Sequence, residues 1–272
     1  MNKLEPSNQQ KLFGLDKHIL ELVRLHKTNT YPNKILFSGL KGIGKSTLAY
    51  HFINYVLSEN EDHKYDLRNF EINSDSPTFK TILNKSNTNL ITIDINSDKK
   101  SIDINQIREL IGNLNKSSFN NKPRFVLIDN IELLNINSVN ALLKALEEPN
   151  QNVHFILINN NKKNTPTLLS RCINYKINLS NKECFEIANL LLGKDLKNLI
   201  NKDLINYYFT PGNIYYLSKF SEQYEYNLLD LDLNNFLKTI IKENLYKKDP
   251  FMRYMVFQLI EFSSLPSTAP EG

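Results

Sequence analysis

The fold of this chain is constrained most by a glycine-rich loop that lies between an apolar segment and a helical pattern. The stretch from Ile35 to Tyr50 reads ILFSGLKGIGKSTLAY and contains the pattern G-x-x-x-x-G-K-[ST] from Gly39 to Ser46. The apolar residues before the loop are typical of a short strand. The residues after the loop have helical spacing, namely Leu48, Ala49, Phe52, Ile53 and Val56. Because the pattern stands between a strand and a helix, the sequence predicts a loop that binds phosphate groups.

The residue types in this loop suit the chemistry of phosphate binding. Glycines allow the backbone to turn tightly and to direct several N–H groups towards phosphate oxygens at a helix N-terminus. Lys45 can reach the outer phosphates as a point charge, and the Ser46 hydroxyl can ligate Mg²⁺. The alternative, a glycine-rich turn that merely contains a lysine, does not account for the correct flanks on both sides. The predicted nucleotide-binding residues of the loop are Gly39, Gly42, Ile43, Gly44, Lys45, Ser46 and Thr47.

A second motif lies about eighty residues after the loop. The segment from Arg124 to Asp129, RFVLID, is a continuous apolar run that ends in an aspartate, which is typical of a strand buried on both faces of a parallel sheet. The carboxyl end of such a strand emerges beside the phosphate loop. In this Walker B arrangement Asp129 holds magnesium, usually through water, so Ser46 and Asp129 are the predicted metal ligands. An aspartate can also end a strand for turn reasons alone, and the preceding loop favours the magnesium interpretation.

Strand and helix patterns alternate along the first two thirds of the chain. The expected strands are Ile35 to Ser38, Asn89 to Ile95, Arg124 to Asp129, His154 to Asn159 and Ile173 to Leu179. The expected helices are 12–27 with Asp16 as its cap, the helix after the loop, one opened by the capping box Asp103-x-x-Gln106, and Asn137 to Pro149. Such alternation predicts an α/β fold with a five-stranded parallel sheet and helices on both faces. The loops that carry Lys45, Asp129 and Asn159 are then expected at one edge. Residues 58–88 are polar and predict no clear element.

Strand signals cease after Ser180. Short helices are expected at 182–192, 196–209 and 214–220, with Pro211-Gly212 as a break between the last two. An apolar face from Leu233 to Ile241 predicts a further helix, and Asp249-Pro250 is typical of the start of a last helix that ends near Phe262. The remaining tail is polar and is expected to be disordered.

Composition excludes several classes of protein. The chain has 272 residues, a formal net charge of +4 and only two cysteines, which is too few for a disulfide framework or a four-cysteine zinc set. The N-terminus lacks the apolar core of a signal peptide, and no apolar run approaches the roughly 18 residues that span a bilayer. We therefore expect a cytoplasmic protein without membrane contact. The mild positive charge permits contact with nucleic acid but does not demand it.

The order of these motifs resembles bacterial clamp-loader subunits of the AAA+ class, and most closely the delta-prime type of DNA polymerase III. The resemblance covers roughly residues 10–180. It is carried by LFSGLKGIGKSTLA, SIDINQIREL, RFVLIDNIELLNINSVNALLKALEEP, HFILINN and TPTLLSRC in this order.

The resemblance implies a place in a ring of related subunits that opens a sliding clamp and loads it onto primed DNA. The implied partners are gamma or tau and delta subunits, with the clamp and DNA reached through the complex. In the family the arginine of SRC acts in trans on the nucleotide of the adjacent subunit, which assigns Arg171 the role of an arginine finger. Its alternative is an arginine that starts a strand and forms a surface salt bridge. Asn159 falls at the sensor position that contacts the outer phosphate, although a strand-ending turn amide is the simpler alternative.

The sequence also departs from the active motors of this family. Asn130 stands where those members have a water-orienting glutamate, and Glu132 is not counted as its replacement. The stretch Pro211-Gly212-Asn213 lacks the sensor arginine, and residues 58–88 lack the cysteines of the family's zinc module. We therefore expect binding of ATP or ADP with Mg²⁺, weak or absent hydrolysis, and no zinc. A gamma/tau-like motor, a small-molecule kinase and a ring member that binds no nucleotide remain as alternatives.

The resemblance further implies the division of the chain into parts. The expected parts are an AAA+ nucleotide-binding domain at 1–179, a helical lid at 180–221, a partial helical collar at 222–264 and a disordered tail at 265–272.

Overall fold

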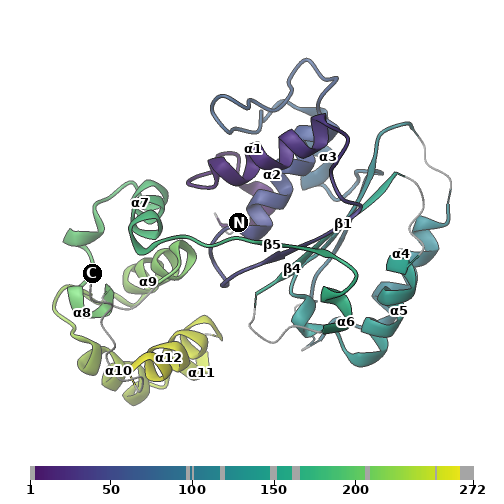
Figure 1. Cartoon of the computed structure of the whole chain (residues 1–272). Coiled ribbons are helices and arrows are strands. Elements are labelled where there is room, and N and C mark those ends of the chain that lie inside the picture. The colour runs from purple at the N-terminus through teal and green to yellow at the C-terminus, as the bar shows by residue number, and fades with distance from the viewer. Residues whose placement is uncertain are drawn as a thin grey trace, which may run out of the picture. The chain divides into compact units, whose positions relative to one another are not determined.

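The computed structural model describes residues 4–95, 99, 101–116, 120–147, 152–160, 166–205, 209–248 and 250–263. The chain divides into two compact units, Met1–Asn178 and Leu179–Gly272, which are coloured purple to green and green to yellow in Figure 1. This boundary lies one residue before the expected end of the nucleotide-binding domain. The predicted tail at 265–272 lies outside the described residues.

The first unit is built on a five-stranded sheet with the order β2-β3-β4-β1-β5. The strands are β1 (Lys34–Ser38), β2 (Leu90–Ile93), β3 (Arg124–Ile128), β4 (Val153–Asn159) and β5 (Ile173–Lys176). All pairs are parallel, as predicted. In the centre of the sheet β3 and β4 are buried on both faces, which explains their continuous apolar sequences.

Helices cover both faces of this sheet (Figure 1), with α1, α2 and α3 on one side and α4 and α5 on the other. The helices are α1 (Asp16–Lys27), α2 (Lys45–Leu57), α3 (Pro77–Leu83), α4 (Ile104–Leu114), α5 (Ile136–Glu147) and α6 (Pro166–Leu169), with 3-10 turns at Pro6–Asn8 and Ile131–Leu133. The apolar stripes of α4 and α5 pack on one face of the sheet in a cluster that includes Ile107, Leu110, Val126, Leu142, Phe155 and Leu157. The division of polar and apolar positions along these helices therefore fixes how the sheet is covered.

Two predicted helix starts have different outcomes. The capping box of α4 is confirmed, since the Asp103 carboxylate accepts from the Asn105 N–H at 2.9 Å and the Asp103 N–H donates to Gln106 Oε1 at 3.0 Å. The prediction for the first helix is wrong in its start and its cap. It begins at Asp16, the cap position belongs to Leu15, and no side chain caps it. Asp16 instead places its charge in the first turn, where it complements the helix dipole.

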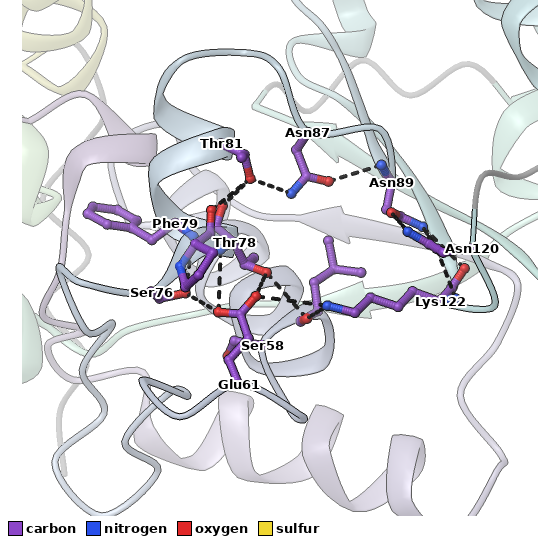
Figure 2. A network of polar contacts seen from close by, with 12 residues as sticks. Ser58, Glu61, Ser76, Thr78, Phe79, Thr81, Asn87, Asn89, Asn120 and Lys122 are labelled. Carbon is purple, nitrogen blue, oxygen red and sulfur yellow. Dashed lines mark hydrogen bonds and ion pairs between the residues drawn. The ribbon is translucent and has the colours of Figure 1, made fainter.

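The segment between α2 and β2, for which the sequence predicts no element, is held by a network around Glu61 (Figure 2). The Glu61 carboxylate accepts from Ser76 Oγ at 2.7 Å and from Thr78 Oγ1 at 2.6 Å, which attaches α3 to the end of α2. Lys122 Nζ donates to the carbonyl of Leu57 at 2.6 Å and lies 3.8 Å from Glu61. Because these groups come from three separate segments, the network joins the segment to both α2 and the start of β3.

A buried histidine connects α2 to this segment. His51 is fully buried, with Nε2 3.0 Å from the Gln9 carbonyl and Nδ1 2.9 Å from the Tyr65 hydroxyl. A carbonyl can only accept, so Nε2 carries the proton and Nδ1 accepts from the tyrosine. Burial lowers the pKa of His51 to about 4. The folded protein therefore keeps this imidazole neutral.

We expect stability to fall as the pH is lowered through the range between the two pKa values of His51. An unfolded histidine, with a pKa near 6.5, takes up a proton that the folded chain refuses, so the unfolded state binds more protons. The loss from His51 amounts to about 2 kcal/mol between about pH 7 and about pH 5. Urea unfolding followed by circular dichroism measures it. In His51→Gln the decrease is smaller by that amount, and an equal decrease in both proteins would contradict the assignment.

The second unit is entirely helical in its described residues. Its elements are α7 (Asn181–Leu192), a 3-10 turn at Leu196–Asn198, α8 (Lys202–Ile205), α9 (Pro211–Tyr224), α10 (Leu233–Lys242), α11 (Leu245–Lys248) and α12 (Pro250–Ser263). The predicted break at Pro211-Gly212 is wrong, because both residues lie in the first turn of α9 and the Thr210 hydroxyl caps it by accepting from Asn213 N–H at 3.3 Å. Proline is favoured at this position because a backbone N–H in the first turn has no acceptor within the helix, so its absence in proline breaks no hydrogen bond.

One hydrophobic core runs through this unit. Leu217 of the expected lid and Phe236 of the expected collar belong to the same buried cluster. Because this core includes residues on both sides of residue 221, it does not mark a boundary between lid and collar, and that division stays a prediction. Asp249, the predicted cap of the last helix, lies outside the described residues. Among the described helices none has the length and apolar character needed to cross a bilayer.

Candidate nucleotide-binding site

The glycine loop lies between the end of β1 at Ser38 and the start of α2 at Lys45. Gly39, Gly42 and Gly44 have φ angles of 153°, 88° and 93°, a region that residues with side chains rarely adopt. A Cβ atom at Gly39 would lie 2.3 Å from the carbonyl oxygen of Ile177. The backbone of the loop therefore requires glycine at its first position for space as well as for conformation.

Lys45 is folded into this loop. Its side chain is buried, and Nζ donates to the carbonyls of Gly39 at 2.9 Å and Leu40 at 2.6 Å. Burial lowers the pKa of Lys45 to about 8, while the charges of Asp129 and Glu132 oppose that shift. An ammonium held by two carbonyls can exchange them for phosphate oxygens, which bind it more strongly because they carry charge.

The two predicted motifs meet at Ser46 and Asp129. These residues are 83 positions apart in the sequence, and the Ser46 hydroxyl donates a hydrogen bond to Asp129 Oδ2. A hydroxyl and a carboxylate are hard oxygen donors, the set that Mg²⁺ prefers. The donor set therefore fits the predicted magnesium ion, which these two residues would hold.

Asn160 is the functional candidate that sequence reasoning missed. Its Nδ2 donates to Asp129 Oδ1 and to Asn130 Oδ1, both at 3.0 Å, and its backbone N–H donates to Glu132 Oε2 at 3.2 Å. The predicted sensor Asn159 is the last residue of β4, is buried and pairs with Ser38 beside the loop. Successive side chains of a strand alternate in direction, so a polar pair at a strand end is a signal that either residue can serve the site.

Further carboxylate and amide side chains lie around Asp129. Asn130 has a left-handed φ of 53°, and its Nδ2 donates to Asp94 Oδ1 at 2.7 Å. Burial raises the pKa of Asp94 and, in the 3-10 turn that follows, the pKa of Glu132. The amide of Asn130 cannot take a proton from water. Two carboxylates lie close to it, since Asp94 accepts from Asn130 itself and Glu132 accepts from Asn160, which also contacts Asn130.

Arg171 lies where the amino ends of the strands meet, opposite the carboxyl ends that carry the glycine loop. It precedes β5, which runs parallel to β1, whereas Lys45 and Asp129 follow the carboxyl ends of their strands. Its Nε and Nη2 donate to Glu147 Oε1 at 3.1 and 2.8 Å, and Nη1 donates to the carbonyl of Thr167 at 3.1 Å. The sheet thus separates this guanidinium from the loop of its own chain.

The sheet order, the glycine loop after β1 and the carboxylate after β3 define a P-loop α/β domain with AAA+ architecture. Comparison with known proteins gives the family. Residues 14–181 match the family model described as DNA polymerase III, delta subunit, and the chain belongs to that family. The resemblance inferred from the motifs is confirmed at this level.

Individual relatives carry the names of more than one subunit type. DNA polymerase III subunit gamma of Buchnera aphidicola subsp. Schizaphis graminum is 28% identical over 198 residues, which are 72% of this chain and 52% of the relative. DNA polymerase III subunit delta' of Buchnera aphidicola subsp. Baizongia pistaciae is 29% identical over 165 residues, 56% of this chain and 46% of the relative. This chain spans about half the length of these curated relatives.

Similar solved structures come from Thermotoga maritima. A DNA polymerase III gamma subunit-related protein is 20% identical, with 80% of this chain and 66% of that chain covered and a TM-score of 0.41. The RuvB Holliday junction branch migration motor is 17% identical, with 88% and 81% covered and a TM-score of 0.46.

Proposed function

We propose that this chain is a delta-prime-like subunit of the DNA polymerase III clamp loader, which helps ATP-dependent loading of the sliding clamp on primed DNA in the cytoplasm. In this role it holds a nucleotide without rapid hydrolysis and lends Arg171 to the nucleotide of a neighbouring ATPase subunit. The observation that carries the proposal is the placement of Arg171 and the glycine loop at opposite edges of one sheet.

The binding half of the proposal rests on Lys45, Ser46 and Asp129. The loop N–H groups at the start of α2 and the Lys45 ammonium are arranged to bind the phosphates of ATP or ADP. Ser46 and Asp129 supply the oxygen donors for magnesium. When bound, Mg²⁺ neutralises charge on the outer phosphate oxygens.

Weak hydrolysis follows from the residue after Asp129. Asn130 is turned towards Asp94 and cannot accept a proton, and loss of a positioned base commonly lowers a rate by about 10²- to 10⁴-fold. Slow turnover would leave the nucleotide in place as a structural part of the subunit. Glu132 favours the alternative, a gamma/tau-like motor, because it shares Asn160 with Asp129, and the similarity to gamma subunits favours it as well.

The donor half of the proposal rests on Arg171. A guanidinium at the edge opposite the loop cannot serve its own nucleotide, but it is available to a second protomer. An arginine finger supplied in trans stabilises negative charge as the phosphoryl group transfers. The neighbouring subunit would be a gamma or tau type, since that chain must supply the active site.

Contact with DNA has a candidate surface in a groove of about 500 Å³ between α4 and α5. Arg108 and Lys144 line it together with the amide side chains Asn115, Asn137 and Asn140 and the apolar residues Ile104, Ile111, Ala141 and Ala145. Cations and amides are the side chains that bind phosphate backbones without reading sequence. Each such subunit in a ring would add a few phosphate contacts, so the contribution of one chain is small. We expect no zinc requirement, because residues 58–88 contain no cysteine and Glu61 and its partners hold this segment by hydrogen bonds.

Reconstitution with gamma-type and delta-type subunits tests the proposal. We expect this chain to co-purify with them, to show background ATP turnover alone, and to form a complex whose turnover rises with the clamp and primed DNA. Turnover by the isolated chain that Lys45→Ala abolishes would instead favour the gamma/tau alternative. Failure to co-purify would reject the ring role.

A further inference from the structure

We propose that Glu147 is a positioning residue for Arg171, which fixes the guanidinium so that its end-on edge faces the nucleotide of the neighbouring protomer. The inference rests on the proposed trans role of Arg171. Glu147 is the last residue of α5, 24 positions before Arg171, and its carboxylate binds the arginine two residues before β5 begins.

The contacts of Arg171 divide the guanidinium into two edges. The side-on edge, formed by Nε and Nη2, is bound by a single oxygen, Glu147 Oε1, at 3.1 and 2.8 Å. The end-on edge is formed by Nη1 and Nη2. Nη2, which belongs to both edges, is already held by Glu147, and among the described residues Nη1 is engaged by the Thr167 carbonyl at 3.1 Å and more weakly by Ser170 Oγ at 3.4 Å.

This arrangement suits a group that acts on phosphate. A guanidinium binds phosphate bidentately through one of its edges, and Glu147 occupies the edge that a phosphate does not then need. The carboxylate also removes most of the rotamer freedom of a long side chain before the neighbour arrives. About 35% of the Arg171 side chain stays exposed, so the group is held in place without being covered.

A plain surface ion pair is the simpler explanation of the same contact. Exposed pairs contribute little to stability, and nothing about such a pair predicts an effect on a neighbour's chemistry. A third possibility is that the carboxylate competes with the phosphate for the arginine. The three explanations predict different turnover of the assembled ring, which makes them separable.

The experiment measures steady-state ATP turnover of the reconstituted clamp loader that contains Glu147→Ala. We expect kcat at the adjacent subunit to fall about 3- to 10-fold with KM for ATP unchanged, because ordering one long side chain costs about that factor, and turnover summed over the ring falls by less. Glu147→Gln should stay within about twofold of the wild type, since its amide oxygen still accepts both N–H groups. Glu147→Ala in an Arg171→Ala background should lower turnover no further, as expected for two residues that act as one unit.

The controls separate failure of this inference from failure of the proposed function. Glu186→Ala removes the exposed Lys182 ion pair of α7, at 3.9 Å, and should leave turnover unchanged. Unaltered affinity of the chain for nucleotide shows that each variant is folded. If Arg171→Ala lowers turnover and Glu147→Ala leaves it unchanged or raises it, the positioning role is wrong while the trans role stands. If Arg171→Ala has no effect, both are wrong.

Discussion

Replacing Arg171 by alanine is expected to lower ATP turnover at the adjacent subunit by at least about tenfold while leaving the nucleotide affinity of this chain unchanged. Arginine fingers supplied in trans contribute about 10³- to 10⁵-fold to phosphoryl transfer, and turnover summed over a ring falls less because other sites keep their own arginines. The measurement is ATPase activity of the reconstituted complex with clamp and primed DNA, beside a titration of the isolated chain with a fluorescent ATP analogue.

Two variants sharpen this prediction. Arg171→Lys keeps the charge but replaces the planar fork by a point charge, so it should restore only part of the activity. Arg24→Ala removes an exposed arginine that pairs with Glu21 at 2.8 Å on α1, and it should have no effect. Normal ring turnover in Arg171→Ala would reject the trans role. A loss of nucleotide binding by this chain would show that the substitution acts through its own fold.

Short-range chemistry made much of the fold predictable. Strands such as β3 and β4 are continuous apolar runs because both of their faces are covered, and the capping box at Asp103 is a local signal that needs no partner. The contact between Ser46 and Asp129 was also accessible, since parallel strands bring their carboxyl ends to one edge. The strands and the capping box depend on residues within one strand or one turn of each other, and the Ser46–Asp129 contact follows from the general rule for parallel sheets.

Other features depend on residues that the chain brings together only after folding. Helix α3 is seven residues long and is held by Glu61, 15 positions before Ser76, so periodicity alone could not reveal it. Its Ser76-Pro77 start is a cap signal of the same kind as Thr210-Pro211, where proline opens a helix and does not break one. Proline and glycine mark a boundary, but the side of the boundary on which the helix lies depends on the capping residue.

The site was predicted less completely than the fold for the same reason. Lys45, Ser46 and Asp129 are identified by motifs, whereas Asn160 is linked to Asp129 by an amide contact across 31 positions. The sequence does not place Glu132, because the path of the chain after Asn130 is not set by a local pattern. The left-handed backbone of Asn130 and the 3-10 turn that follows bring this carboxylate to Asn160. A single left-handed residue therefore decides which carboxylates surround the predicted magnesium ligand.

Replacing Lys45 by alanine is expected to weaken binding of a fluorescent ATP analogue to the isolated chain by about 10- to 100-fold. A hydrogen bond to a charged group contributes about 1.5–3 kcal/mol, and the Lys45 ammonium is held within the loop where the outer phosphates would lie. Lys45→Met, which keeps the apolar stem in its buried position, separates loss of charge from loss of packing and should bind as weakly as alanine.

Lys41→Ala is the matched control, because Lys41 is an exposed lysine of the same loop and its removal should change affinity only about twofold or less. Equal affinity of Lys45→Ala and wild type would show that the loop does not bind phosphate through this residue, and absence of binding by the wild-type chain would favour a ring member without a nucleotide. Because both results are obtained without any partner, they test the binding half of the proposal independently of the arginine at the opposite edge of the sheet.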